Sequence, residues 1–196
     1  MRIILASGSP RRQELLGRMG IRDFEISVPD IDEHMDRQLT PDVLVATISA
    51  EKARAAAALV GDPDALVIAA DTVVTLDGQV LGKPRDRADA VRMLTGLSGR
   101  QHQVYTGFTV LRGDKLVSRS ECTQVFFRAL IAEEIQAYVD TGEPMDKAGA
   151  YGIQGIGSLL VEGISGDYFN VVGLPVCALG RVLSDFGVEC LMLAGR

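Results

Sequence analysis

A continuous apolar run at residues 65–70 restricts the fold of this chain more than any other feature. The run reads ALVIAA and ends at Asp71. Because a strand with one face in water alternates apolar and polar residues, an unbroken apolar run predicts a strand that is covered on both faces. Such strands are typical of sheets that carry helices on both sides.

The rest of the chain alternates between strand-like and helix-like segments. Residues 3–6 predict a short strand, and Ser9, Pro10 and Gly20 predict the N-cap, first residue and C-terminal stop of a helix. Asp77-Gly78 predicts a two-residue hairpin turn. Further helices are expected at about 41–61, from Asp86 or Asp89 to 96–99, at 131–142 and from about 174, and further strands at 103–111, 116–127 and 158–164. A glycine-rich loop is expected at 143–157.

This order of elements predicts an α/β fold with a mixed twisted sheet and flanking helices. No repeat, low-complexity segment or flexible linker divides the chain. We therefore expect a single domain over residues 1–196, in which any second lobe is nested rather than tethered.

Charge and composition exclude several classes of function. The 20 basic and 26 acidic residues give a formal charge of −6, so the chain has no excess of cations for binding a polynucleotide. No apolar stretch approaches the roughly 18 residues that a membrane span needs, and the first residues lack a signal-peptide pattern. Cys122, Cys177 and Cys190 show no metal-binding spacing and lie in apolar runs, so we expect buried, reduced thiols in a cytoplasmic protein.

The turn between the first strand and the first helix has the features of an anion site. A helix N-terminus offers free backbone N–H groups and the positive end of the helix dipole, and here Arg11 and Arg12 lie beside it. An arginine fork can donate two parallel hydrogen bonds to a phosphate. The alternative is a capped helix with two solvated arginines.

Two acidic positions are candidates for binding a metal ion or activating water. Asp71 follows the buried strand, and ligands of open α/β sheets bind at the carboxyl ends of strands. Glu33 lies in the acidic stretch 30–33, where hard oxygen ligands suit Mg²⁺. The alternatives are a turn-forming aspartate and a solvated run of charges.

The chain has only four lysines among its basic residues, and three of them occupy unusual segments. Lys52 lies among alanines, Lys83 in LGKP and Lys147 in DKAG, whereas Lys115 lies in a hairpin turn, where arginine should replace it without consequence. A compact ammonium in an arginine-rich chain suggests sites that a guanidinium does not fit. His34 and His102 are too few and too far apart for a histidine metal centre, so we expect structural or surface roles for them.

Taken together, these segments resemble the Maf family of nucleoside triphosphate pyrophosphatases. The segments that carry the resemblance span nearly the whole chain in the family's order: ASGSPRRQELL, EKA, AADTVV, LGKPRD, VYTG, EPMDKAGAYGIQG and VVGLP. The pair DTVV and AYGIQG resembles the branch that acts on dTTP and UTP rather than the branch that acts on 7-methyl-GTP.

The resemblance implies a cytoplasmic enzyme, often a homodimer, that needs a divalent cation (Mg²⁺, Mn²⁺ or Co²⁺) and hydrolyses a nucleoside triphosphate to the monophosphate and pyrophosphate. It also implies an elongated, two-lobed fold like that of inosine triphosphate pyrophosphatases, with a deep central cleft. Neither a polynucleotide nor a membrane is an expected partner.

The resemblance also assigns roles to individual residues. Asp71 falls on the proton acceptor, and the specificity positions are Arg11, Thr72 and Gln154. The phosphate- and metal-side positions are Ser7, Arg12, Glu33, Lys52 and Lys83. Asp71 and Glu33 would hold the metal. The alternative function is a nucleotide-binding regulator of cell division (septum inhibition) with little turnover, and a third possibility is an enzyme that prefers modified pyrimidines or purines.

Overall fold

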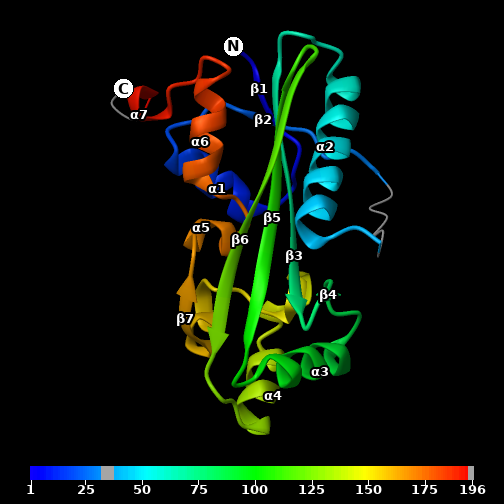
Figure 1. Cartoon of the computed structure of the whole chain (residues 1–196), viewed down its shortest axis with the longest axis vertical. Coiled ribbons are helices and arrows are strands. Elements are labelled where there is room, and N and C mark those ends of the chain that lie inside the picture. Colours follow the sequence, from blue (N-terminus) through cyan, green and yellow to red (C-terminus); the bar gives the residue numbers. More distant parts are fainter. Residues whose placement is uncertain (32–37, 194–196) are drawn as a thin grey trace. The chain divides into compact units, whose positions relative to one another are not determined.

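The computed structural model describes residues 1–31 and 38–193, and it has the predicted α/β architecture (Figure 1). The strands are β1 (Ile3–Leu5), β2 (Glu25–Ile26), β3 (Leu66–Leu76), β4 (Gln79–Leu81), β5 (Gln101–Arg112), β6 (Lys115–Phe127) and β7 (Val161–Ser165). The helices are α1 (Pro10–Arg18), α2 (Pro41–Val60), α3 (Arg87–Leu97), α4 (Ala132–Asp140), α5 (Tyr168–Val172), α6 (Val176–Ser184) and α7 (Cys190–Leu193).

The strands form a mixed sheet, as the sequence predicts. Their order is β2-β1-β3-β5-β6-β7, and β4 pairs with β3. β1 runs parallel to β2 and β3, whereas the β3–β4 and β6–β7 pairs are antiparallel. Asp77 and Gly78, at the β3–β4 turn, both have positive φ, as a two-residue hairpin turn of the favoured hand requires.

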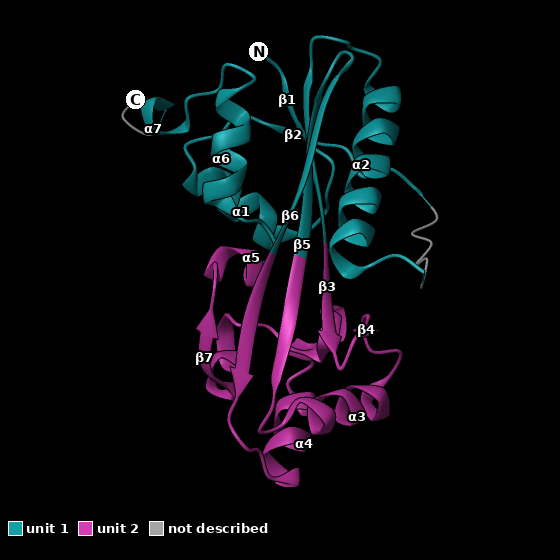
Figure 2. Cartoon of the chain, viewed as in Figure 1, with its two compact units in different colours: residues 1–71, 106–121, 173–196 teal, residues 72–105, 122–172 magenta. Residues whose placement is uncertain are grey.

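The chain divides into two compact units, each assembled from separate segments of the sequence (Figure 2). Unit 1 comprises residues 1–71, 106–121 and 173–196, and unit 2 comprises residues 72–105 and 122–172. The division falls inside β3, between Asp71 and Thr72.

β3 does not end at Asp71, and that prediction is wrong. The strand continues through Thr72, Val73 and Val74 to Leu76. These residues favour extended backbone, and the first residues that force a turn are Asp77 and Gly78. Asp71 therefore lies in the middle of a long strand.

In unit 1, α2 packs closely on the sheet because small residues face each other. Ala53 and Ala56 of α2 are fully buried against Val67 and Ala69 of β3. A Cβ on Gly107 of β5 would lie 2.2 Å from the carbonyl oxygen of Val45 in α2, so only glycine fits there. α1 and α6 lie on the other side of the unit 1 strands (Figure 2).

A buried chain of hydroxyl groups also fastens α2 to the β5–β6 hairpin. Ser49 Oγ lies 2.8 Å from Thr109 Oγ1, which donates to Ser118 Oγ at 3.0 Å. Ser49 and Ser118 both donate to the carbonyl oxygen of Ala46. The helix is therefore held by hydrogen bonds as well as by close packing.

In unit 2, the expected glycine-rich loop is largely a series of short 3₁₀ helices. These helices span Glu143–Asp146, Ala148–Ala150 and Gly155–Leu160, and they shorten the following strand to β7. α5 lies between the strand predicted at 158–164 and the helix predicted from about 174, where no helix is predicted. α3 begins after Asp86, whose side chain accepts a hydrogen bond from the Asp89 N–H, which decides between the two predicted starts.

Two further expectations about individual residues change. Cys122 and Cys177 are exposed and Cys190 is half-buried, so the expectation of buried thiols is wrong. Lys115 is not a free turn residue: its Nζ donates to the carbonyl oxygen of Asp185 and lies 4.4 Å from the ring centre of Phe186. Among the residues described, no helix is both long and apolar enough to cross a membrane.

Candidate active site

The centre of the candidate site in unit 1 is an ion pair between α2 and β3. Side chains alternate along a strand, so Asp71 shares the face of Val67 and Ala69 that α2 covers. Lys52 projects from α2 at that point, and its Nζ lies 2.7 Å from Asp71 Oδ1. The Lys52 and Asp71 side chains are only 12% and 11% exposed. The close packing of α2 thus places an ammonium and a carboxylate together at the edge of an alanine-lined core.

The turn before α1 forms a second cluster in unit 1. Arg12 donates from Nη1 to Ser7 Oγ at 3.1 Å and from Nε to the carbonyl oxygen of Gly173 at 2.8 Å. Ser9 occupies the N-cap position of α1, but its side chain makes no capping bond; its N–H donates to Ser7 Oγ instead. Ser7 therefore links the turn to Arg12 at the start of the helix.

Unit 2 holds three of the predicted site residues. Thr72 follows Asp71 in β3, Lys83 is exposed in the segment after β4, and Gln154 is half-buried just before the 3₁₀ helix Gly155–Leu160. The segments of Lys83 and Gln154 approach one another, because the Gly149 N–H donates to the carbonyl oxygen of Gly82 at 3.0 Å. A backbone hydrogen bond therefore joins the LGKP segment, which contains Lys83, to the segment that precedes Gln154.

The chain that follows Lys83 is held by a buried carboxylate. Asp89 accepts hydrogen bonds from the N–H and Nε of Arg85 and from Nε and Nη2 of Arg92. These bonds hold the pKa of Asp89 well below its usual range, and the bond from the Arg85 side chain has the largest effect. Asp89 therefore stays ionised and fixes the start of α3 behind the LGKP segment.

The remaining predicted residues differ in what the structure says of them. Arg11 lies in the first turn of α1, next to Arg12. Glu33, together with His34, lies outside the described residues. The predicted pair of metal ligands is therefore represented by Asp71 alone.

The described donor set fits a divalent cation that comes with its phosphates. Within residues 1–31 and 38–193, no group of three or more His, Cys, Asp or Glu side chains could hold a metal by itself. Mg²⁺ in nucleotide sites is typically bound by one or two carboxylates, substrate phosphates and waters. Asp71 offers one hard carboxylate, whose Oδ1 accepts a hydrogen bond from Lys52 Nζ.

The sequence gives no motif for one buried polar contact in unit 2. His102 Nε2 lies 2.8 Å from Tyr151 Oη, and both rings pack edge-on against Phe127. His102 is 2% exposed, and burial lowers its pKa to about 4, so the ring is neutral at pH 7. Of the structural and surface roles expected for His102, its burial fits the structural one, and the contact anchors Tyr151 three residues before Gln154.

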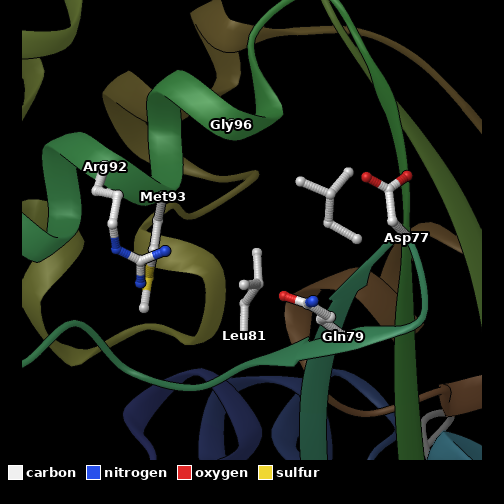
Figure 3. Close-up of a pocket in the computed structure, with 7 residues that line it drawn as sticks. Asp77, Gln79, Leu81, Arg92, Met93 and Gly96 are labelled. Atoms are coloured by element: carbon white, nitrogen blue, oxygen red, sulfur yellow. The ribbon is translucent and has the colours of Figure 1, made fainter.

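Unit 2 also contains a cavity of about 140 Å³ (Figure 3). Its lining comes from the β3–β4 hairpin and α3 and consists of Leu76, Asp77, Gln79, Leu81, Arg92, Met93 and Gly96. None of the predicted site residues lines it. The predicted site residues therefore lie outside this cavity.

The family model described as "Maf-like protein" matches residues 2–186. The chain belongs to the Maf family. Among curated relatives, the dTTP/UTP pyrophosphatases of Symbiobacterium thermophilum and Moorella thermoacetica are both 54% identical to this chain. The first alignment covers 94% of both chains and the second 96% of both. The dTTP/UTP pyrophosphatase of Bacillus anthracis is 47% identical over 188 residues, which is 96% of this chain and 97% of that protein.

A solved structure places the Maf fold in a wider context. A HAM1 protein from Coxiella burnetii matches with a TM-score of 0.52 and 17% identity, over 94% of this chain and 99% of that one. At this level of identity the likeness concerns the fold, and it agrees with the mixed sheet and flanking helices described above.

Proposed function

We propose that this Maf protein is a nucleoside triphosphate pyrophosphatase that hydrolyses dTTP and UTP to the nucleoside monophosphate and pyrophosphate. The observation that carries the proposal is the buried contact between Lys52 and Asp71. A carboxylate and an ammonium in contact provide a proton acceptor and a phosphate-binding cation at the same point. The names of the relatives that are 47–54% identical support the choice of substrates.

The reaction needs one proton acceptor and several positive charges. The oxygen of water attacks the α-phosphorus, the bond from that phosphorus to the oxygen bridging to the β-phosphate breaks, and pyrophosphate leaves with the electron pair. We assign Asp71 as the general base that takes the proton of the attacking water. Lys52 holds the Asp71 carboxylate in position and adds positive charge toward the phosphates.

Other cations and donors are assigned to the triphosphate chain. Arg12 and Ser7, joined by a hydrogen bond at the N-terminus of α1, suit one phosphate group. The exposed ammonium of Lys83 suits another. Phosphoryl transfer depends mainly on such positioning and charge neutralisation, so a protein with a net charge of −6 can perform it with a few local cations.

Recognition of the base is assigned to Gln154, with Thr72 and Arg11 as further specificity residues. The amide of Gln154 has both a donor and an acceptor, which match the imide edge that uracil and thymine share. Cytosine presents a different pattern at the same edge. An amide held in one orientation would therefore select dTTP and UTP over CTP.

A divalent cation, Mg²⁺, Mn²⁺ or Co²⁺, is part of the proposal. Asp71 and Glu33 would hold it, and when bound it neutralises charge on the phosphates. The homodimer and the cytoplasmic location expected of a Maf protein also belong to the proposal.

The test is a panel of nucleoside triphosphates incubated with the purified full-length chain and each of the three cations. The panel contains dTTP, UTP, CTP, the purine nucleotides and 7-methyl-GTP, and products are separated by ion-exchange chromatography. We expect dTMP or UMP and pyrophosphate in equal amounts. Preferential hydrolysis of 7-methyl-GTP would refute the substrate assignment, and binding without turnover would favour the regulatory alternative.

A further inference from the structure

Glu143 begins the EPMDKAGAYGIQG segment, but the resemblance to the Maf family assigns it no role. One of its carboxylate oxygens, Oε1, accepts the Tyr138 hydroxyl at 2.9 Å and the Gly157 N–H at 3.0 Å. The other, Oε2, accepts the Ile156 N–H at 3.2 Å. The carboxylate thus holds the first turn of the 3₁₀ helix that follows Gln154.

Tyr138 connects the same carboxylate to the other end of the segment. Its hydroxyl oxygen accepts a hydrogen bond from the Gly152 N–H at 3.2 Å, and the hydroxyl group donates a hydrogen bond to Glu143. Tyr138 is 3% exposed, and burial raises its pKa further above the usual value, so the hydroxyl stays protonated and able to donate. Gln154 therefore lies in a short segment whose two ends are tied to one Tyr–Glu pair.

The packing around this segment leaves little space for a Cβ atom at Gly152 or Gly157. A Cβ on Gly157 would lie 2.2 Å from the Gly152 carbonyl oxygen and 2.6 Å from Tyr138 Oη. A Cβ on Gly152 would lie 2.8 Å from Lys147 Cε. The segment between Gly152 and Gly157 is therefore pressed directly against the side chains that hold it.

The side chain of Lys147 lies against Gly152 and supports the same segment. Its Nζ donates to the carbonyl oxygen of Glu143 and to Asp146 Oδ1, both at 2.6 Å. The lysine thereby fixes the backbone that carries Glu143. A longer, planar guanidinium would have to fit under Gly152 in the same space, which accounts for lysine at this position.

We propose that Tyr138 and Glu143 are positioning residues that fix the Gly152–Gly157 segment and so determine how strongly Gln154 discriminates between bases. The inference rests on the proposed function, in which Gln154 reads the base. Hydrogen-bonding selectivity requires the amide to be held in one place, because a mobile amide can turn to satisfy the wrong base. Tyr138 and Glu143 act through the backbone on either side of Gln154.

The test uses Glu143→Gln and Tyr138→Phe, each made in the wild-type chain and in Gln154→Ala. A carboxamide keeps the shape of Glu143 but has one acceptor oxygen, and phenylalanine removes only the hydroxyl. Glu162→Gln is the matched control, because Glu162 is an exposed residue of unit 2. The quantity measured is the ratio of kcat/KM for UTP to kcat/KM for CTP, with circular dichroism and Tm as checks of folding.

We expect the UTP-to-CTP ratio to fall about tenfold in Glu143→Gln and in Tyr138→Phe, mainly through a higher KM for UTP. Glu162→Gln should keep the wild-type ratio. In the Gln154→Ala background, neither substitution should change the ratio further, because the amide that they position is gone.

Several results would overturn the inference. An equal loss of activity toward UTP and CTP, or loss of the fold in both variants, would show a purely structural role. A further fall of the ratio in Gln154→Ala would show that the pair does not act through Gln154, and an unchanged ratio in Gln154→Ala itself would remove the premise. Failure of the proposed function is seen separately, as absence of UTP hydrolysis by the wild-type enzyme.

Discussion

Lys52 Nζ and Asp71 Oδ1 are 2.7 Å apart, although the first residue lies in α2 and the second in the middle of β3. Their neighbours on the facing surfaces are alanine and valine, so the two charges have little solvent around them. Removing one partner of a charge pair in such a place destabilises the fold, because the other charge is left buried and uncompensated. This suits a pair retained for chemistry.

The pair predicts a specific pattern of stability. Lys52→Met keeps the volume of the side chain but leaves Asp71 without its ammonium, and we expect the free energy of unfolding to fall by about 2–3 kcal/mol. Adding Asp71→Asn removes the uncompensated charge and should recover at least half of the loss. Urea denaturation of both variants measures this. Equal stability of Lys52→Met and the wild type would mean that the contact contributes nothing to the fold.

His102 predicts a dependence of stability on pH. Its pKa is lowered to about 4 by burial, against about 6.5 in an unfolded chain. Between these values the unfolded state binds a proton that the folded state does not, so the free energy of unfolding falls as the pH is lowered from 6.5 to 4. The expected contribution is about 3 kcal/mol. Below pH 4 both states are protonated and this loss stops growing.

The measurement compares the wild type with His102→Gln at pH 7 and at pH 4.5 by chemical denaturation. Glutamine can still hydrogen-bond to Tyr151 but does not titrate. The variant should lose less stability on acidification than the wild type. The same loss in both proteins would show that His102 does not titrate as described.

Gly107 predicts a large effect from one methyl group. Gly107→Ala places a Cβ against the backbone of Val45 and Ala46, which cannot move without displacing α2, so we expect a loss of about 3 kcal/mol or more. Gly17→Ala is the control: no atom lies within 4 Å of its Cβ position, and alanine should stabilise α1 by about 0.5–1 kcal/mol. Thermal and urea unfolding of the two variants should therefore shift in opposite directions, and a stable Gly107→Ala protein would contradict the close packing of α2.

Local turn chemistry made much of the fold predictable from the sequence. The hairpin at Asp77–Gly78 and the end of α2 at Gly61 follow from residues that tolerate positive φ. The continuity of β3 through Asp71 into the hairpin was not predicted, because an isolated aspartate resembles a turn residue when the pairing of the strand is unknown. The exposure of Cys122 was also missed, since burial depends on which face of a strand its neighbours cover.

The candidate site was predictable only in part. The resemblance to the Maf family supplied its residues, but the sequence contains no signal that Lys52 reaches Asp71, because that contact depends on how closely α2 packs. The contacts of Glu143 could not be predicted either, because its partners Tyr138, Ile156 and Gly157 become its neighbours only when the 3₁₀ helices form. The roles of the remaining residues and the nesting of two lobes in one domain stay predictions.

The central claim is that Asp71 accepts the proton of the attacking water, and the most direct test is turnover of dTTP and UTP by Asp71→Asn with saturating Mg²⁺. Asp23→Asn is the control, because Asp23 is an exposed residue of unit 1. We predict that kcat falls about 10²–10⁴-fold in Asp71→Asn, with the fold retained, and is unchanged in Asp23→Asn. Turnover by Asp71→Asn close to that of the wild type would contradict the account.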